Sequence, residues 1–267
     1  MSATASAAEL LAAVEQSPQA IAVHDRAAWL ELFAPGARVE DPVGSRPHVG
    51  EEAIGRFYDT LIASSDIAFR SAHDVVCGTS VFRDLAVETR MAPGVTLRVP
   101  MHLRYDLAHL GGEWKIRQLR AHWELPVMSA QLLAAGVPGV LVSAKLGPRL
   151  LANQGIGGAL GFARGFIRVS AAGKRAATGL LESAGRGSTP AVRNALAPTA
   201  TLEWPAGTRI TPEEFVTRAA GIQVTKPISA GRYVTTSVET TTGRGIAELE
   251  LSRGSKLITT ARLYVPD

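Results

Sequence analysis

Segments with a helix-like spacing of apolar residues come first along the chain, and segments with strand-like alternation follow. Helices are expected over 7–24, 27–33 and 51–64. Strands rich in branched apolar residues are expected over 67–71, 81–91, 97–105 and 115–124. Helices followed by a run of strands are typical of an α+β fold, in which a bent antiparallel sheet is backed by helices.

The sequence pattern of the first half recurs in a degenerate form towards the end of the chain. Val39-Glu40-Asp41-Pro42 is echoed by Leu202-Glu203-Trp204-Pro205. Further strands are expected over 222–226, 232–239, 245–251 and 257–265. The repeat predicts two tandem cone-like α+β domains, each a curved antiparallel sheet backed by helices, joined by a helical linker. The expected division is 1–128 for the first domain, 129–190 for the linker and 191–267 for a degenerate second domain.

The segment 129–190 is rich in Gly and Ala, and it carries seven Lys or Arg residues against the single acid Glu182. Its apolar runs are too short for the roughly 20 residues that a membrane-spanning helix needs. Two interpretations stay open: a helical arm that packs on the domains or on another subunit, or a basic surface in peripheral contact with anionic lipid. We favour packing, because Gly157, Gly161 and Gly165 would line one helix face and permit close approach.

A single carboxylate stands where the first strand stops. Pro42 and Gly44 end the strand directly after Asp41. An Asp at the end of a strand in this setting is well placed to face a cavity, where apolar neighbours would hold it as a base.

These residues resemble the ketosteroid isomerase branch of the nuclear-transport-factor-like (SnoaL-like) fold. The resemblance runs from about Ala22 to Trp123, and it rests on Leu-Phe-Ala at 32–34, Val-Glu-Asp-Pro at 39–42, Gly44, Ala-Ile at 53–54 and Phe-Tyr at 57–58. It implies that Asp41 is a base that moves a proton next to a ketone, while a Tyr and a protonated acid stabilise the dienolate oxygen. It also implies a hydrophobic small-molecule ligand and two copies that pack together as a pseudo-dimer within the chain.

The alignment places other residues at the family's two oxyanion donors. Ser17 falls at the donor Tyr and Met101 at the protonated acid, so we expect Tyr58 to be the replacement donor, with Ser17 second. Met101, Leu103, Tyr105 and Trp123 would alternate onto the concave face and line an apolar cavity. His102 would point to the opposite face as a packed or interface histidine. The predicted catalytic residues are Asp41 and Tyr58, and the predicted substrate-binding residues are Ser17, Met101, Leu103, Tyr105 and Trp123.

Three functions follow from the resemblance. The first is an isomerase-like enzyme that acts on a steroid-like or other hydrophobic ketone with Asp41 as base. The second is a non-catalytic steroid or lipid binder, and the third is an epoxide hydrolase that pairs Asp41 with a second carboxylate, for which Asp66 and Asp84 are candidates. Trp204 stands at the position of Asp41 in the second copy and cannot accept a proton, so base chemistry is expected in the first copy alone.

Composition limits the classes of protein to which the chain can belong. A hydrophobic content of 46% with 19% charged residues is that of an ordinary globular protein. Cys77 is the only cysteine, so an intrachain disulfide is excluded, and residues 1–16 contain no Lys or Arg of the kind that begins a secretion signal. We therefore expect a cytoplasmic protein. The six His residues lack a metal-ligand spacing, and no nucleotide or nucleic-acid motif is present, so no metal, cofactor or nucleic acid is expected.

Overall fold

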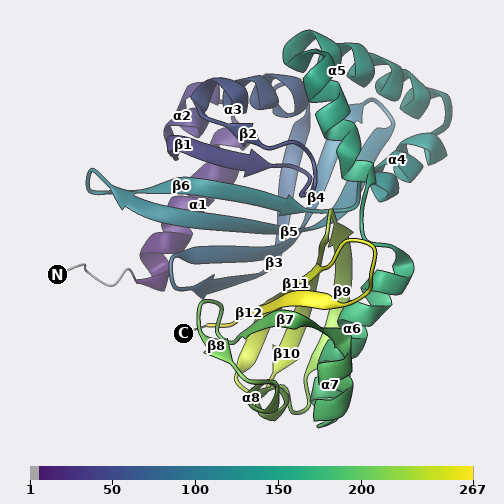
Figure 1. Cartoon of the computed structure of the whole chain (residues 1–267). Coiled ribbons are helices and arrows are strands. Elements are labelled where there is room, and N and C mark those ends of the chain that lie inside the picture. Colours follow the sequence, from purple (N-terminus) through teal and green to yellow (C-terminus); the bar gives the residue numbers. More distant parts are fainter. Residues whose placement is uncertain (1–5, 267) are drawn as a thin grey trace.

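Each half of the chain forms a six-stranded sheet, and the two sheets have the same strand order. In the computed structural model, which describes residues 6–266, the orders are β2-β1-β6-β5-β4-β3 and β8-β7-β12-β11-β10-β9 (Figure 1). Helices cover one face of each sheet, and the first sheet lies above the second in the view of Figure 1. The prediction of two tandem α+β domains is confirmed.

The first domain follows the predicted order of helices and then strands. Its helices are α1 (Ala7–Ala22), α2 (Arg26–Glu31), α3 (Glu51–Phe57) and the π-helical turn η1 (Tyr58–Ile62). Its strands are β1 (Phe33–Glu40), β2 (His48–Val49), β3 (Asp66–Cys77), β4 (Ser80–Ala92), β5 (Val95–Leu110) and β6 (Glu113–His122). Ser6 and Glu9 form a capping box at the start of α1, and Asp25 caps α2. These side chains bond backbone N–H groups that a helix start leaves free.

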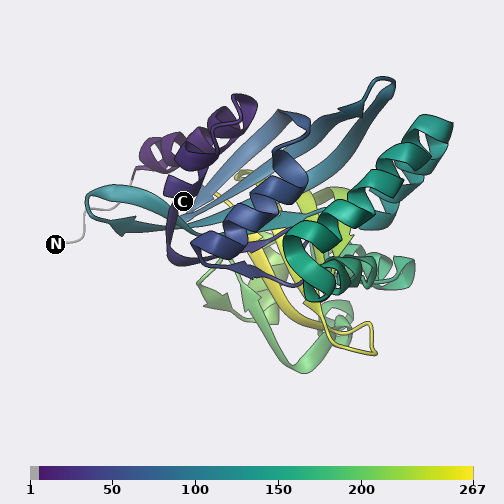
Figure 2. The same cartoon turned by 90° about the horizontal axis from the view of Figure 1, so that it is seen from above.

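Three helical elements follow the first sheet: α4 (Leu125–Ala134), α5 (Gly136–Ala163) and η2 (Arg164–Phe166). Helix α5 bends at Gly155, where the backbone leaves helical geometry, and it runs beside the first sheet in both views (Figures 1 and 2). Among the helices of residues 6–266, none combines the length and apolar character needed to cross a membrane. Contact of 129–190 with a lipid surface stays a prediction.

The second domain repeats the first in a shorter form. Its helices are α6 (Ala171–Gly185), α7 (Thr189–Ala195) and α8 (Pro212–Arg218), and its strands are β7 (Leu196–Glu203), β8 (Arg209–Ile210), β9 (Gln223–Ala230), β10 (Tyr233–Thr240), β11 (Gly243–Leu251) and β12 (Ile258–Tyr264). Helix α6 lies inside the predicted linker, yet Leu180 and Leu181 are buried in the core of the second domain. By its packing, α6 is therefore the counterpart of α1, whereas the predicted boundaries themselves stay a prediction.

The sheets are mixed rather than wholly antiparallel as predicted. Strand β1 runs parallel to β6, with Val39 beside Leu119, and β7 runs parallel to β12. In each domain at least one helix and four strands separate the two members of the pair along the chain. No hairpin therefore joins them, and nothing imposes the antiparallel arrangement of directly connected strands.

The small residues of α5 pack against the turn that follows β1 rather than against another helix. The backbone N–H of Arg46 donates to Gly161 O at 3.1 Å, and a Cβ atom at Gly161 would lie 2.6 Å from that of Arg46. Just beyond α5, a Cβ at Gly165 would lie 2.7 Å from Cγ of Pro42. The glycine spacing thus permits close approach, as predicted, but its partner is the segment that carries Asp41.

The two sheets pack face to face, on the sides away from their own helices. Phe82 and Cys77 meet Ile246 and Tyr264 in a small buried apolar cluster. His102 is fully buried there, and its two ring nitrogens lie 2.9 Å from Thr235 Oγ1 and 3.0 Å from Ser237 Oγ. The prediction of an interface histidine on the face opposite Met101 is confirmed.

A buried ionic network also crosses the interface. Glu248 on β11 is 1% exposed, and its carboxylate accepts hydrogen bonds from Arg120 Nη1 at 2.8 Å and Arg104 Nη1 at 3.1 Å. Strand pairing shows which residues of the two domains correspond. Arg104 pairs with Arg120 on β6, and Glu248 pairs with Arg262 on β12. Arg104 and Glu248 are therefore equivalent positions of the two copies, and they face each other.

Candidate active site

Asp41 lies in the turn that begins directly after β1. The turn is held to β6 by the hydrogen bond from Val43 N to Ala121 O at 2.9 Å. Trp123 follows the last residue of β6, and its Nε1 donates to Asp41 Oδ1 at 2.6 Å. In residues 6–266 no other side chain is hydrogen-bonded to this carboxylate. The parallel β1–β6 pair thus places the acid and its single donor side by side.

The carboxylate faces a cavity of about 120 Å³. Four lining residues bear polar groups: Asp41, Trp123, Ser65 and Thr89. The rest of the wall is apolar and comes from α3, η1, strands β3 to β5 and the linker helices: Phe57, Leu61, Ile62, Ile67, Val87, Met91, Val99, Met101, Met128 and Phe162. The cavity therefore suits a hydrophobic ligand with few hydrogen-bonding groups.

Burial in this wall raises the pKa of Asp41 to about 6, although the hydrogen bond from Trp123 lowers it in part. The cause is desolvation, since the charged form loses water and gains only one donor. A carboxyl group with a pKa near 6 is present in both protonation states close to neutral pH. It can therefore take up a proton and return it, as a general acid–base catalyst must.

The structure brings together three of the seven predicted site residues. Asp41, Met101 and Trp123 line the cavity, whereas Tyr58 does not. The Tyr58 ring packs 5.4 Å from that of Trp29, and its buried hydroxyl has no hydrogen-bond partner within residues 6–266. Tyr58 as an oxyanion donor thus stays a prediction that this arrangement does not support.

Ser17, Leu103 and Tyr105 lie deeper in the cone and also outside the cavity lining. Ser17 Oγ accepts a hydrogen bond from Trp29 Nε1 at 3.0 Å, and Leu103 and Tyr105 are buried in the core. Trp29 of α2 is fully buried and fills the deep end of the cone. The cavity therefore lies beside Asp41 and does not extend to these three residues.

Several lining residues were not predicted. Val99 lies two residues before Met101 on β5, so strand alternation was sufficient to find it. Ser65 follows the π-helical turn, and Thr89 lies on β4. Met128 and Phe162 come from α4 and α5, and no local pattern links these helices to a strand of the first domain.

The other carboxylates named from the sequence lie elsewhere. Asp66 is largely exposed, with His24 Nε2 at 3.9 Å from its Oδ1. Asp84 lies at the domain interface, where it accepts hydrogen bonds from Lys226 and from Ser237. Asp41 is thus the only carboxylate among the described residues that line the cavity.

In the second domain, Trp204 follows β7 at the position that Asp41 takes after β1. It is buried in the second core, with its ring 5.7 Å from that of Phe215. Its indole ring offers no proton acceptor at this position. A carboxylate at this position is therefore present in the first copy and replaced in the second.

Comparison with known proteins agrees with this architecture. Residues 14–115 match the SnoaL-like domain family, which confirms the resemblance noted in the sequence. The match ends before the second domain. No curated protein matches the chain.

Similar solved structures include three bacterial proteins, each of which covers about half of this chain. The Δ5-3-ketosteroid isomerase from Mycobacterium sp. is 26% identical, with a TM-score of 0.41, over 45% of this chain and 96% of its own. RV0760c from Mycobacterium tuberculosis, in complex with estradiol-17beta-hemisuccinate, is also 26% identical, with a TM-score of 0.41, over 45% of this chain and 96% of its own. A putative SnoaL-like polyketide cyclase from Shewanella putrefaciens is 16% identical, with a TM-score of 0.42, over 47% of this chain and 96% of its own.

Proposed function

We propose that the first domain is an isomerase-like enzyme that moves a proton next to the carbonyl group of a hydrophobic ketone, with Asp41 as the base. The observation that carries this proposal is the isolated carboxyl group, with its pKa raised to about 6, in an apolar cavity. Such a group is common at catalytic sites, because burial of an unpaired acid costs stability that packing alone does not require.

The proposed reaction has two proton transfers and no net change in composition. Asp41 takes a proton from the carbon next to the carbonyl group, which leaves a dienolate and a neutral carboxyl group. The carboxyl group then returns the proton two carbons along, and the double bond becomes conjugated with the ketone. Trp123 Nε1 orients the carboxylate through its hydrogen bond to Oδ1.

The dienolate oxygen requires a hydrogen-bond donor, since developing charge in a dry cavity is costly. Ser65 and Thr89 are the hydroxyl groups that line the cavity and are the candidates for this role. Trp123 is already engaged with Asp41. We therefore assign the donor to Ser65 or Thr89 in place of Tyr58.

The size of the cavity selects among ketones. Its volume of about 120 Å³ is well below the ~300–1,000 Å³ of pockets that hold drug-sized ligands. A single-ring ketone is therefore the favoured substrate class, and a four-ring steroid requires displacement of wall side chains such as Phe162 and Met128.

Non-catalytic binding of a hydrophobic ligand is the second candidate. It is favoured by the positions of Ser17 and Tyr58, which both lie outside the cavity lining. The epoxide hydrolase alternative needs a second carboxylate near Asp41, and the described lining residues supply none.

Conversion of a single-ring β,γ-unsaturated ketone to its conjugated isomer, followed by absorbance, tests the proposal. We expect kcat/KM to fall about tenfold per pH unit below pH 6 and to level off above it, because the base must be ionised in the free enzyme. Conversion whose rate does not change between mildly acidic and neutral pH would contradict a role for Asp41. Binding of the ketone without conversion at any pH would instead identify a binding protein.

Phe162→Ala is expected to raise kcat/KM for a four-ring ketosteroid by about tenfold or more relative to the single-ring ketone. The substitution removes a large ring from the cavity wall, and pocket contacts of this size discriminate substrates by such factors. Phe166→Ala is the matched control, because Phe166 is 51% exposed and does not line the cavity. An equal change for both substrates, or the same effect in the control, would show that Phe162 does not limit substrate size.

A further inference from the structure

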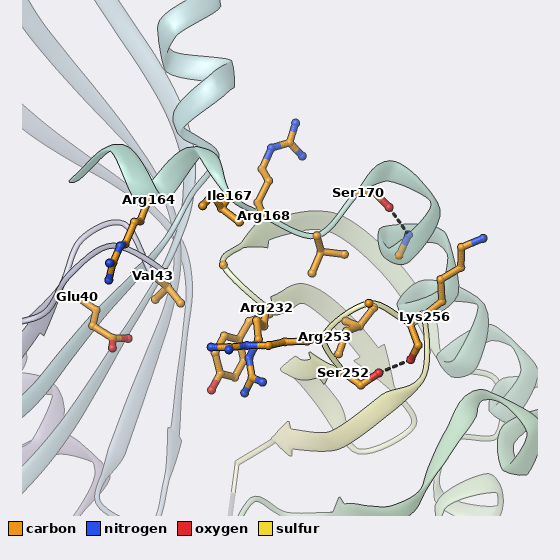
Figure 3. Close-up of a pocket in the computed structure, with 18 of the residues that line it drawn as sticks. Glu40, Val43, Arg164, Ile167, Arg168, Ser170, Arg232, Ser252, Arg253 and Lys256 are labelled. Carbon is orange, nitrogen blue, oxygen red and sulfur yellow. Dashed lines mark hydrogen bonds between the residues drawn. The ribbon is translucent and has the colours of Figure 1, made fainter. Parts of the chain in front are cut away.

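A second and larger pocket lies between the two domains. Its volume is about 1210 Å³, and its walls come from the turn after β1, the segment that joins α5 to α6, and the loop that joins β11 to β12 (Figure 3). It differs from the Asp41 cavity in its residues. Only the turn of residues 41–44 contributes to both.

The charge on this pocket is strongly one-sided. Its lining includes six basic side chains, Arg120, Arg164, Arg168, Arg232, Arg253 and Lys256, against the single acid Glu40. Like charges gathered around one concave surface repel each other and attract an anion. The excess of positive charge in the pocket therefore favours the binding of a negatively charged ligand.

Three of these six cations are already neutralised. Arg120 bonds Glu248 at 2.8 Å, and Arg232 pairs with Glu250. Arg168 donates to Ser229 at 2.9 Å and lies 3.5 Å from Glu124. The contacts of Arg120 and Arg168 join the second domain to the first domain and to the connecting segment, whereas the Arg232 pair lies within the second domain. These three side chains shape the pocket rather than leave charge available.

The other three cations are available. Within residues 6–266, no ion pair or side-chain hydrogen bond involves Arg164, Arg253 or Lys256. Figure 3 shows Arg164 and Arg253 extending from opposite walls towards the side of Glu40, whereas Lys256 points outward. Two guanidinium groups on the same side of one pocket supply planar pairs of N–H groups for a doubly charged oxyanion.

An apolar wall stands beside these cations. Ile167, Val169 and Leu251 line the pocket, and Ile167 is 74% exposed although it is a large apolar residue. Exposed apolar area next to a charged group is typical of a surface that binds an amphipathic molecule. The pocket is also far larger than a lone phosphate ion requires.

We propose that the interdomain pocket binds a phosphate ester with an apolar body, the phosphate group between Arg164 and Arg253 and the body against Ile167 and Val169. A monoester carries close to two negative charges at neutral pH and so balances the two arginines. The same chemistry is offered by a soluble phosphate ester and by the headgroup of an anionic lipid. The inference is independent of the proposed reaction at Asp41.

Titration calorimetry of the full chain with hexyl phosphate, inorganic phosphate and hexanol tests the inference. We expect one site per chain for hexyl phosphate, weaker binding of inorganic phosphate and no binding of hexanol at the same concentrations. Arg164→Gln with Arg253→Gln is expected to weaken hexyl phosphate at least about tenfold, since each lost bond to a charged group costs that factor or more. Asp41→Asn is expected to bind it as the wild type does.

The control is Arg209→Gln with Arg244→Gln, which removes two exposed arginines outside the pocket and leaves the net charge of the two double variants equal. Equal weakening in both double variants, or no saturable binding of hexyl phosphate, overturns the proposal. Sedimentation with phosphatidylglycerol vesicles separates the two sources. If the wild type binds vesicles and the Arg164→Gln, Arg253→Gln variant does not, the ligand is a lipid headgroup. If the variant loses hexyl phosphate binding and the wild type does not bind vesicles, the ligand is a soluble ester. Both outcomes support the pocket.

Discussion

Asp41→Asn is expected to lower kcat for isomerisation of a single-ring β,γ-unsaturated ketone by a factor of about 10²–10⁴, which is the usual contribution of a positioned general base. The amide keeps the shape of the carboxylate and can still accept the hydrogen bond from Trp123, but it cannot take up the proton. Steady-state kinetics, with ketone binding measured separately by calorimetry, checks this expectation. Binding should change little, because the substitution leaves the apolar wall intact.

Asp66→Asn is the matched control, since Asp66 is an exposed carboxylate outside the cavity lining. It is expected to leave kcat unchanged. Unaltered turnover in Asp41→Asn would remove Asp41 from the mechanism, and an equal loss in both variants would point to a general effect of charge.

Asp41→Asn is also expected to raise the free energy of unfolding near neutral pH. The folded protein raises the pKa of Asp41 from 3.8 to about 6, so the folded state holds the proton more tightly than the unfolded chain does. Stability therefore falls as pH rises from about 4 to 6, and the cost is fully present above that window. Asp41→Asn should remove this cost, about 2–3 kcal/mol, in urea unfolding at pH 7.5. A gain in stability together with a loss of turnover excludes misfolding as the cause.

Glu248→Gln is expected to reduce the free energy of unfolding by about 3–5 kcal/mol, because it leaves buried arginines without their counter-charge. Glu248 is 1% exposed and bonds Arg104 and Arg120, the latter itself only 7% exposed. Burial by itself would raise the pKa of Glu248, but Arg120, Arg104 and His122 outweigh it and hold the pKa well below 4.5. The stabilisation is thus present above about pH 4.5 and is lost in acid as pH falls through the folded-state pKa.

Urea unfolding, followed by tryptophan fluorescence at neutral pH, measures this loss. Glu213→Gln is the control: its carboxylate pairs with Arg193 at 2.6 Å, but both side chains are more than half exposed. A pair of this kind contributes about 0–1 kcal/mol. A loss in Glu248→Gln no larger than in Glu213→Gln would mean that the interface relaxes to admit water around the arginines.

The sequence was sufficient for the fold because its signals are local. Strand alternation, the repeated Pro-containing turn and the order of helices and strands each depend on neighbouring residues. The place of Asp41 follows from the same kind of signal, since Pro42 and Gly44 stop the strand directly after it. Alternation also separated Met101 from His102, and the structure puts the first in the cavity and the second at the domain interface.

The shape of the cavity was not predictable in this way. Trp29 is buried in the core of the cone, where its Nε1 donates a hydrogen bond to Ser17. Phe162 lines the cavity from a helix more than a hundred residues after the turn. These contacts depend on how distant elements pack, which no local pattern encodes. The predicted lining named Leu103 and Tyr105, which do not line this cavity, and omitted the linker helices.

The contact between Arg104 and Glu248 also limits how the two domains can associate. In a dimer of identical subunits related by a two-fold axis, a residue on that axis meets its own copy. A self-dimer of the first domain through this face would set Arg104 against Arg104, and one of the second domain would set Glu248 against Glu248. Like charges buried in contact cost several kcal/mol. Within this single chain one position is basic and its counterpart is acidic, so the face of each domain is complementary to the other domain and not to a second copy of itself.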